Sequence, residues 1–218
     1  MDRRRPAGMR THIKIERRPN QAPLPARAPA VHIGRMDHAG WRSRGYLPHC
    51  DERGLVQHIV FGLADSLPKA IPASIIDPIK RAEWADRALD VGHGGRLLAK
   101  PEHASEVQRC LLHDDGASYA LAAWCIMPTH VHVVVEQFDG HPLANVIQSW
   151  KSITSHAINK AEARKGPLWR REYFDRFMRS EEQFAWTVEY VECNPVTARL
   201  VERSEHWSFS SARWKRCA

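Results

Sequence analysis

The chain has 218 residues, of which 43% are apolar, with a formal net charge of +7 and five cysteines. This composition supports one sizeable core, so we expect a single domain with at most an added tail. The cysteines are odd in number and form no CxxC pair, which argues against a disulfide framework and a cysteine-based zinc site, and no apolar run is long enough to cross a membrane. We expect a soluble, cytoplasmic protein.

The positive charge is concentrated near the N-terminus. Residues 1–45 hold 11 Lys and Arg against 3 Asp and Glu, a net charge of +8, and the rest of the chain has a net charge of −1. This first segment is also rich in proline and lacks hydrophobic periodicity, as disordered segments do. We therefore expect a basic, disordered tail at residues 1–40 and one folded domain at residues 41–218.

The first half of the domain alternates between strand and helix patterns. Residues 55–63 are rich in apolar and β-branched side chains and predict a strand. Residues 72–89 have helical spacing, although Pro78 makes the first turn uncertain. Residues 90–95, with the sequence DVGHGG, predict a flexible break, and residues 101–112 predict a second helix.

Two strands come next, at residues 119–126 and 130–137, joined by a tight connection at 127–129. We expect them to form a hairpin at the centre of a sheet. Residues 143–164 then predict a long amphipathic helix, because apolar side chains recur on one face.

The last predicted elements are a loop at residues 168–180 and a shorter helix at residues 181–193. We expect Asn194 and Pro195 to end this helix, because the residue before a proline is pushed out of the helical conformation. Helices packed on an antiparallel sheet make an α+β fold.

Two histidines, His130 and His132, stand in the last of these strands. Alternate residues of a strand point to the same face, so both imidazoles can converge on one ion while Val131 and Val133 point to the other face. The pair alone is weak evidence in a chain with 13 histidines. The alternative is two partly exposed strand histidines with no ligand.

Tyr190 and Asn194 stand four residues apart near the end of the last helix. This spacing places both side chains on one helical face, close enough to serve one site. The alternative is that Tyr190 packs against the sheet and that Asn194 caps the helix before Pro195. The spacing alone does not decide between them.

Five motifs occur in order through the domain and resemble those of REP-associated tyrosine transposases, relatives of the single-tyrosine HUH transposases of small bacterial insertion sequences. The resemblance covers the chain from about Trp41 to the C-terminus. Most departures are mild: Thr129 and Cys193 stand where relatives often have Asn. The motifs are WRSRGYLPH, ADSLP, MPTHVHVVVE, KGPLWRREYFDRFMRSEEQF and YVECNPVTARLVERSEHWSFSSA.

The resemblance implies a ferredoxin-like or RRM-like HUH nuclease fold and a metal-dependent DNA strand transferase. It assigns the metal ligands to His130, His132 and Asn194, and the nucleophile to Tyr190. A ligand set of two nitrogens and one oxygen without thiolate suits Mg²⁺ or Mn²⁺. The expected product is a 5′-phosphotyrosine, from which a 3′-hydroxyl can rejoin another strand. Tyr173 is the only serious rival nucleophile, but Phe177 stands four residues after it.

The substrate that the resemblance implies is single-stranded or hairpin DNA from palindromic (REP) repeats. Residues 151–179 carry 8 Lys and Arg against 3 Asp and Glu and include several aromatic residues, so they are the expected DNA-contacting segment. A solvated helix face with core aromatics is the alternative. The expected contacts within the segment are Lys151, Arg170, Arg171, Tyr173 and Arg176.

Three functions remain open at this point. The first is a DNA strand transferase, the second a regulator of the same fold that binds nucleic-acid hairpins without cleaving them, and the third a metal-dependent hydrolase that uses water. Glu136, on the His130 face, is a hypothetical partner behind the metal ligands. We expect a monomer, with a dimer as the alternative.

Overall fold

The computed structural model describes residues 41–43, 48–50, 54–67, 80, 84 and 87–214, with no side-chain description for the first two of these ranges. The predicted tail at residues 1–40 therefore lies outside the described residues. Most of the predicted helix at residues 72–89 lies outside them too, but its described residues 80, 84 and 87–89 are helical.

A four-stranded antiparallel sheet forms the centre of the domain, with the strand order β4-β5-β3-β6. Three of its strands match the predicted ones. A separate two-stranded sheet pairs β1 (Trp41–Ser43) with β2 (Pro48–Cys50). The strands of the main sheet are β3 (Val56–Gly62), β4 (Tyr119–Ile126), β5 (His130–Gln137) and β6 (Phe174–Phe177).

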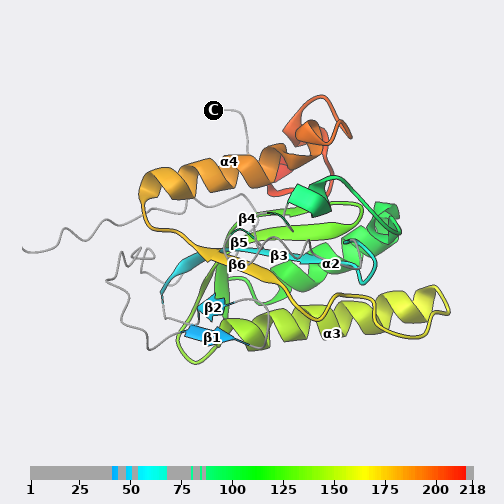
Figure 1. Ribbon diagram of the computed structural model, residues 1–218, viewed down its shortest axis with the longest axis horizontal. Coiled ribbons are helices and arrows are strands. Elements are labelled where there is room, and N and C mark those ends of the chain that lie inside the picture. The colour runs from blue at the N-terminus through cyan, green and yellow to red at the C-terminus, as the bar shows by residue number, and fades with distance from the viewer. Residues whose placement is uncertain are drawn as a thin grey trace, which may run out of the picture.

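In the described part of the chain, three long helices pack on this sheet: α2 (Pro101–His113), α3 (Leu143–Ala161) and α4 (Glu181–Thr197). Figure 1 shows α4 on one side of the sheet and α2 and α3 on the other. Because α2 connects β3 to β4 and α3 connects β5 to β6, the order is that of a ferredoxin-like β-α-β-β-α-β fold. The α+β prediction is confirmed. Short 3₁₀ helices are η2 (Leu97–Ala99), η3 (Ser204–His206) and η4 (Ser211–Trp214).

The sheet face that packs on α2 and α3 is apolar. Val131 and Val133 of β5 point into this core, as predicted, where they meet Phe61 of β3 and Trp124 of β4. All four side chains are at most 1% exposed. This face fills with hydrocarbon and aromatic side chains and supplies the main packing energy of the domain.

The predicted hairpin of β4 and β5 exists, but it does not lie at the centre of the sheet, because β4 is an edge strand. The C-terminal segment covers that edge. The Ile126 amide donates to the Phe209 carbonyl (2.9 Å) and the Trp124 amide donates to Ser211 Oγ (3.1 Å). Two backbone amides on the open edge of this apolar strand are thus satisfied without a fifth strand.

Two other local predictions are corrected. The predicted loop at residues 168–180 contains strand β6, which pairs with β3 through residues such as Phe174 and Arg176. A four-residue edge strand with two charged residues has too weak a pattern to stand out in sequence. Helix α4 does not end before Asn194 but continues to Thr197, with Pro195 inside it.

Within the described part of the chain, no helix combines the length and apolarity needed to cross a membrane.

Candidate metal and nucleophile site

Two histidine rings of β5 form the base of the site. His130 and His132 lie opposite Gly62 and Val60 of β3, on the sheet face that α4 covers. Their Nε2 atoms are 2.8 Å apart, so both ring nitrogens point at one position, and both residues are at most 1% exposed. The predicted convergence of the two imidazoles is therefore present in the structure.

The other ring nitrogen of each histidine has its own partner. Nδ1 of His130 lies 2.9 Å from Thr129 Oγ1, and Nδ1 of His132 lies 3.1 Å from Nε2 of His58. If each Nδ1 carries its proton and donates to these acceptors, each Nε2 keeps its lone pair for a metal. Thr129, a departure from the usual motif, therefore provides a suitable acceptor, and His58 is a positioning residue that the sequence did not reveal.

Asp90 brings a carboxylate to the same point. Its Oδ1 lies 3.4 Å from His130 Nε2 and 3.5 Å from His132 Nε2. The three residues form a group whose ligand atoms all lie within 4.8 Å of one another, the only such group of His, Cys, Asp and Glu in the described ranges. The sequence suggested no role for Asp90, because it opens a stretch that predicted only a flexible break.

The chain just before Asp90 packs closely on Gly62 of β3. A Cβ atom at Gly62 would lie 2.8 Å from Leu89 Cδ2 and 2.4 Å from Ser66 Oγ, so glycine lets the residue before Asp90 approach the sheet. The loop after Asp90 is also anchored, because the Gly95 amide donates to Asp65 Oδ2 (2.9 Å). The predicted flexible break is thus tied down at this point.

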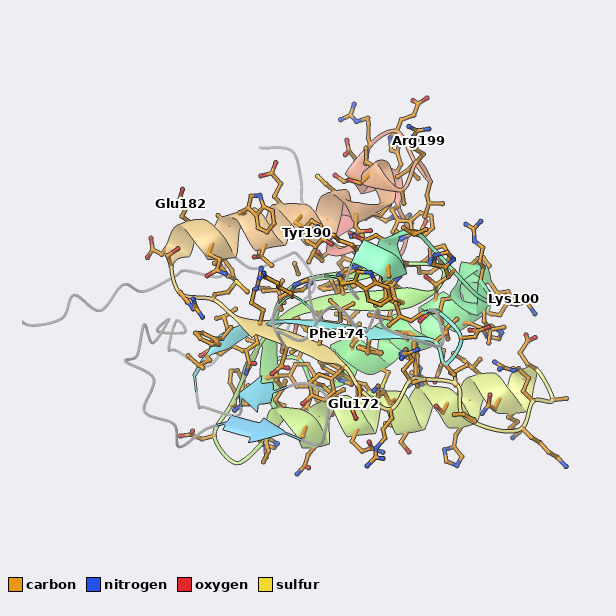
Figure 2. The ribbon with its side chains drawn as sticks, viewed as in Figure 1. Lys100, Glu172, Phe174, Glu182, Tyr190 and Arg199 are labelled. Atoms are coloured by element: carbon orange, nitrogen blue, oxygen red, sulfur yellow. The ribbon has the colours of Figure 1, made fainter. Side chains whose placement is uncertain are left out.

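Helix α4 brings the tyrosine and the amide to the site. The Tyr190 hydroxyl donates to Asp90 Oδ2 (2.9 Å), and Asn194 Nδ2 lies 3.3 Å from His132 Nε2. Figure 2 shows Tyr190 on the side of α4 that faces the sheet. Because the helix continues through Pro195, Asn194 lies one helical turn after Tyr190 on the same face. The backbone carbonyl of Asn194 accepts a hydrogen bond from the Ala198 amide.

The tyrosine ring is held by aromatic neighbours. Its edge contacts with His132 and His58 have ring-centroid distances of 5.8 and 5.9 Å at near-perpendicular angles. On another side the ring stacks on Trp186 at 5.6 Å with an interplanar angle of 8°. The hydroxyl therefore faces the histidine and carboxylate group rather than the apolar interior.

The protonation states suit a cation. Burial lowers the pKa of His130 to about 4, against the opposing hydrogen bond with Asp90, so this ring is neutral at neutral pH. Burial, followed by the proximity of His132, lowers the pKa of His58 well below its usual value. Burial by itself would raise the pKa of Asp90, but hydrogen bonds with His130 and His132, which form in the tautomers that carry the proton on Nε2, outweigh it and hold that pKa well below its usual range. The carboxylate is thus anionic.

These donors fit a divalent cation. Asp90, His130 and His132 offer one oxygen and two nitrogens without thiolate, which matches Mg²⁺, Mn²⁺ or another first-row ion better than a structural zinc. The predicted third ligand, Asn194, lies beside this group with its amide nitrogen 3.4 Å from Asp90 Oδ1. A half-turn of that carboxamide would present its oxygen instead.

Two of the expected DNA contacts are buried structural residues. The Lys151 ammonium donates to the carbonyls of Arg170 (2.8 Å) and Arg171 (3.1 Å), and Lys151 is 8% exposed. Tyr173 is 7% exposed, belongs to the apolar core, and lies with its ring 5.7 Å from that ammonium. This burial argues against the predicted DNA contacts of Lys151 and Tyr173. Lys151 instead supports the segment that carries the two arginines.

The remaining predicted contacts differ in their positions. Arg171 and Arg176 are exposed and Arg170 is partly exposed. Arg176 pairs with His58 in the sheet register, so its side chain leaves β6 on the face of the site. Glu136 lies four residues beyond His132 on β5, roughly 13 Å along the strand, and we leave it out of the site.

Three comparisons bear on these motifs. Residues 102–194 match the family of IS200-like transposases, a range that includes both histidines, Tyr190 and Asn194 but not Asp90. The curated "Putative REP-associated tyrosine transposase" of Haemophilus influenzae is 24% identical over an alignment of 103 positions, whose residues cover 43% of this chain. These residues cover 58% of that relative, less than two thirds of its length.

The solved structure of a REP-associated tyrosine transposase bound to a REP hairpin superposes on this chain with a TM-score of 0.52 at 16% identity. The match covers 79% of this chain and 82% of that one. The two proteins therefore share a fold. Together the three comparisons confirm the resemblance to REP-associated tyrosine transposases that the sequence motifs indicated.

Proposed function

We propose that this protein cleaves and rejoins single-stranded or hairpin DNA, with Tyr190 as the nucleophile. The observation that carries the proposal is the position of the Tyr190 hydroxyl, 2.9 Å from a carboxylate oxygen of Asp90 whose other oxygen faces His130 and His132. A phenol beside a group of potential cation ligands has the parts needed for nucleophilic attack on a phosphodiester.

The covalent step is a transesterification. The Tyr190 oxygen forms a bond to phosphorus while the bond from phosphorus to the 3′-oxygen breaks, which leaves a 5′-phosphotyrosine and a free 3′-hydroxyl. The phenolic proton leaves along the hydrogen bond to Asp90, which does not retain it because its pKa is low, and passes on to the departing 3′-oxygen, so the step consumes and releases no net proton. The number of phosphoester bonds is conserved, so a second 3′-hydroxyl can reverse the step and join another strand without ATP.

A divalent cation bound by Asp90, His130 and His132, beside Asn194, would supply a Lewis acid that polarises the scissile phosphate. Mg²⁺ and Mn²⁺ fit this donor set. The residues around it have separate tasks: Thr129 and His58 orient the two rings, and Asp90 holds the phenol.

Hairpin or single-stranded DNA is the substrate that the site favours. The nucleophile is part of a helix packed on the sheet, so a strand has to bend to bring a phosphate in line with it, and an unpaired strand does so at lower cost than a stacked duplex. The hairpin bound by the structural relative supports this choice. We place Arg170, Arg171 and Arg176 at the DNA backbone, where their charge would contribute salt-dependent affinity.

The test uses end-labelled hairpin DNA with single-stranded arms and Mn²⁺, followed by denaturing electrophoresis. The wild-type protein is expected to form a covalent protein–DNA adduct, and Tyr190→Phe is expected to form none. Tyr173→Phe is the matched control, because it removes a hydroxyl of the same kind from a buried tyrosine outside the site, and its adduct is expected to persist.

Either of two results would overturn this proposal. DNA binding with no cleavage in any variant would identify the hairpin-binding regulator that shares the fold. Cleavage that survives Tyr190→Phe and leaves no adduct would identify a metal-dependent hydrolase in which water is the nucleophile.

A further inference from the structure

The side chain of Trp186 is unusual for a large aromatic residue. It is 60% exposed, whereas Trp150 and Trp169, which lie next to and within the basic segment at residues 151–179, are at most 6% exposed. Both of these rings are core residues: Trp150 Nε1 donates to the Tyr119 hydroxyl and Trp169 Nε1 donates to Thr154 Oγ1. Neither ring is accessible to DNA.

Trp186 directly contacts Tyr190, the proposed nucleophile. It stands one helical turn before Tyr190 on α4, and the two rings stack at 5.6 Å with an interplanar angle of 8°. The stack covers one face of the indole, and the large exposed fraction leaves the rest of the ring open to solvent. A planar ligand placed on that open surface would extend the stack that ends at Tyr190.

The charges on α4 select the part of a nucleic acid that can bind there. Between residues 181 and 197 the helix carries four glutamates and no Lys or Arg. Glu182 and Glu189 lie one turn from Trp186, and Figure 2 shows Glu182 pointing away from the sheet. A phosphate would be repelled by these carboxylates, whereas an uncharged base would not.

Positive charge lies on β6, on the same sheet face as the site. Arg176 is exposed on β6, shares a sheet face with His58 and is close enough to contribute to the lowered pKa of His58. A strand with its backbone along the arginine side would turn its bases toward α4. The charge distribution and the stacking geometry therefore both favour a base, rather than a phosphate, beside Trp186.

We infer that Trp186 is a stacking platform for an unpaired base near the scissile phosphate and that it positions the DNA strand against Tyr190. This inference rests on the proposed function and adds a substrate contact to it. Because every base has a π face, such a platform would tolerate sequence variation and would discriminate an unpaired base from a paired one.

The test is a binding cycle in the Tyr190→Phe background, which keeps the aromatic ring and removes cleavage. The probe is a DNA hairpin with oligothymidine arms in which each arm nucleotide in turn is replaced by an abasic site, and Kd is measured by fluorescence anisotropy. We expect one abasic position to weaken binding about tenfold. Adding Trp186→Ala should weaken binding of the intact probe by a similar factor and abolish the effect of that one position.

Two further variants control for general effects. Ile153→Ala removes another exposed apolar side chain, which is 47% exposed on α3 on the opposite side of the sheet, and should leave the abasic scan unchanged. Trp186→Phe should retain part of the affinity and the same sensitive position, because a smaller aromatic ring still stacks. Equal thermal unfolding midpoints would exclude a loss of fold.

Two results would overturn the inference. The first is that the losses of binding free energy from Trp186→Ala and from an abasic site add for every position in the arms. The second is that Trp186→Ala leaves the affinity for the intact probe unchanged. A Trp186-dependent dimer without DNA, measured by analytical ultracentrifugation, would also overturn it by assigning the surface to a second copy of the chain. Adduct formation by the wild-type protein is measured separately, so failure of the stacking cycle does not imply failure of the transferase proposal.

Discussion

The two faces of the β-sheet are equally buried but chemically different. The face under α2 and α3 consists of side chains such as Val131, Val133 and Phe61, whereas the face under α4 holds His58, His130 and His132, all at most 8% exposed. Burial on the first face stabilises the fold, and burial on the second lowers the pKa values of His58 and His130, so that these two rings stay neutral. Burial alone therefore does not distinguish a core from a site in this protein.

The largest expected effect on stability belongs to the apolar face. Phe61→Ala should lower the free energy of unfolding by about 3 to 5 kcal/mol, because it leaves a cavity between Trp150 and Trp169. Urea denaturation measures the change, and Phe61→Leu should cost clearly less. Adduct formation per folded molecule should be unchanged. A large loss of activity in the folded fraction would show that the two faces are not independent.

The next effect belongs to the site face and should leave the fold intact. Asp90→Asn is expected to lower Mn²⁺ affinity by more than about a hundredfold, because it removes the anionic member of the group. Electron paramagnetic resonance of free Mn²⁺ measures the affinity. Asn194→Ala provides the comparison: a larger loss for Asn194→Ala than for Asp90→Asn would assign the third ligand to Asn194.

A smaller effect is expected behind the ligands. His58→Ala removes the acceptor 3.1 Å from His132 Nδ1 and should lower Mn²⁺ affinity about 10- to 100-fold. His58→Gln offers a replacement acceptor and should recover part of the affinity. Ile59→Val changes the neighbouring residue on the apolar face and should not affect Mn²⁺ binding. Equal affinities for the His58 variants and wild type would remove His58 from the site.

The smallest expected effect is a pH dependence of stability caused by Glu136. This residue lies on the same sheet face as the histidines but farther along β5. Burial raises the pKa of Glu136 to about 7, and its Oε2 has no hydrogen-bond partner among the described residues. The folded state therefore holds the proton of the Glu136 carboxyl more tightly than the unfolded state does. The stability that this protonation contributes is present below about pH 4.5 and is lost as the pH rises through 7. Glu136→Gln should abolish this decline.

At pH 8, Glu136→Gln should be more stable than wild type by on the order of 1 to 3 kcal/mol, measured by urea denaturation across pH. The exposed Glu102 on α2 provides the control, because Glu102→Gln should leave the pH profile unchanged. The buried neutral rings of His58 and His130 add stability as the pH rises through the same range, so the test is the difference between the two profiles. A stability difference between Glu136→Gln and wild type that does not grow between pH 4.5 and 7 would contradict the prediction.

The predictions that hold depend on local interactions along the chain, and those that fail depend on contacts between distant segments. Strand and helix patterns at β3, α2, β4, β5 and most of α3 could be predicted because periodicity is a local property of the chain. Strand β6 could not, because its pairing with β3 depends on a neighbour more than 100 residues earlier in sequence. The predicted end of α4 was wrong, because Pro195 is buried within the helix and the last turn stays helical to Thr197.

Local periodicity was enough to predict the pairs of site residues that are close along the chain: His130 with His132 by strand alternation, and Tyr190 with Asn194 by the helical turn. The tertiary structure alone decided that Asp90, 40 residues before His130, completes the group, and that His58 supports it. It also decided that Lys151 is a structural cation. Contacts between distant segments depend on how the layers pack, and no local periodicity encodes that packing.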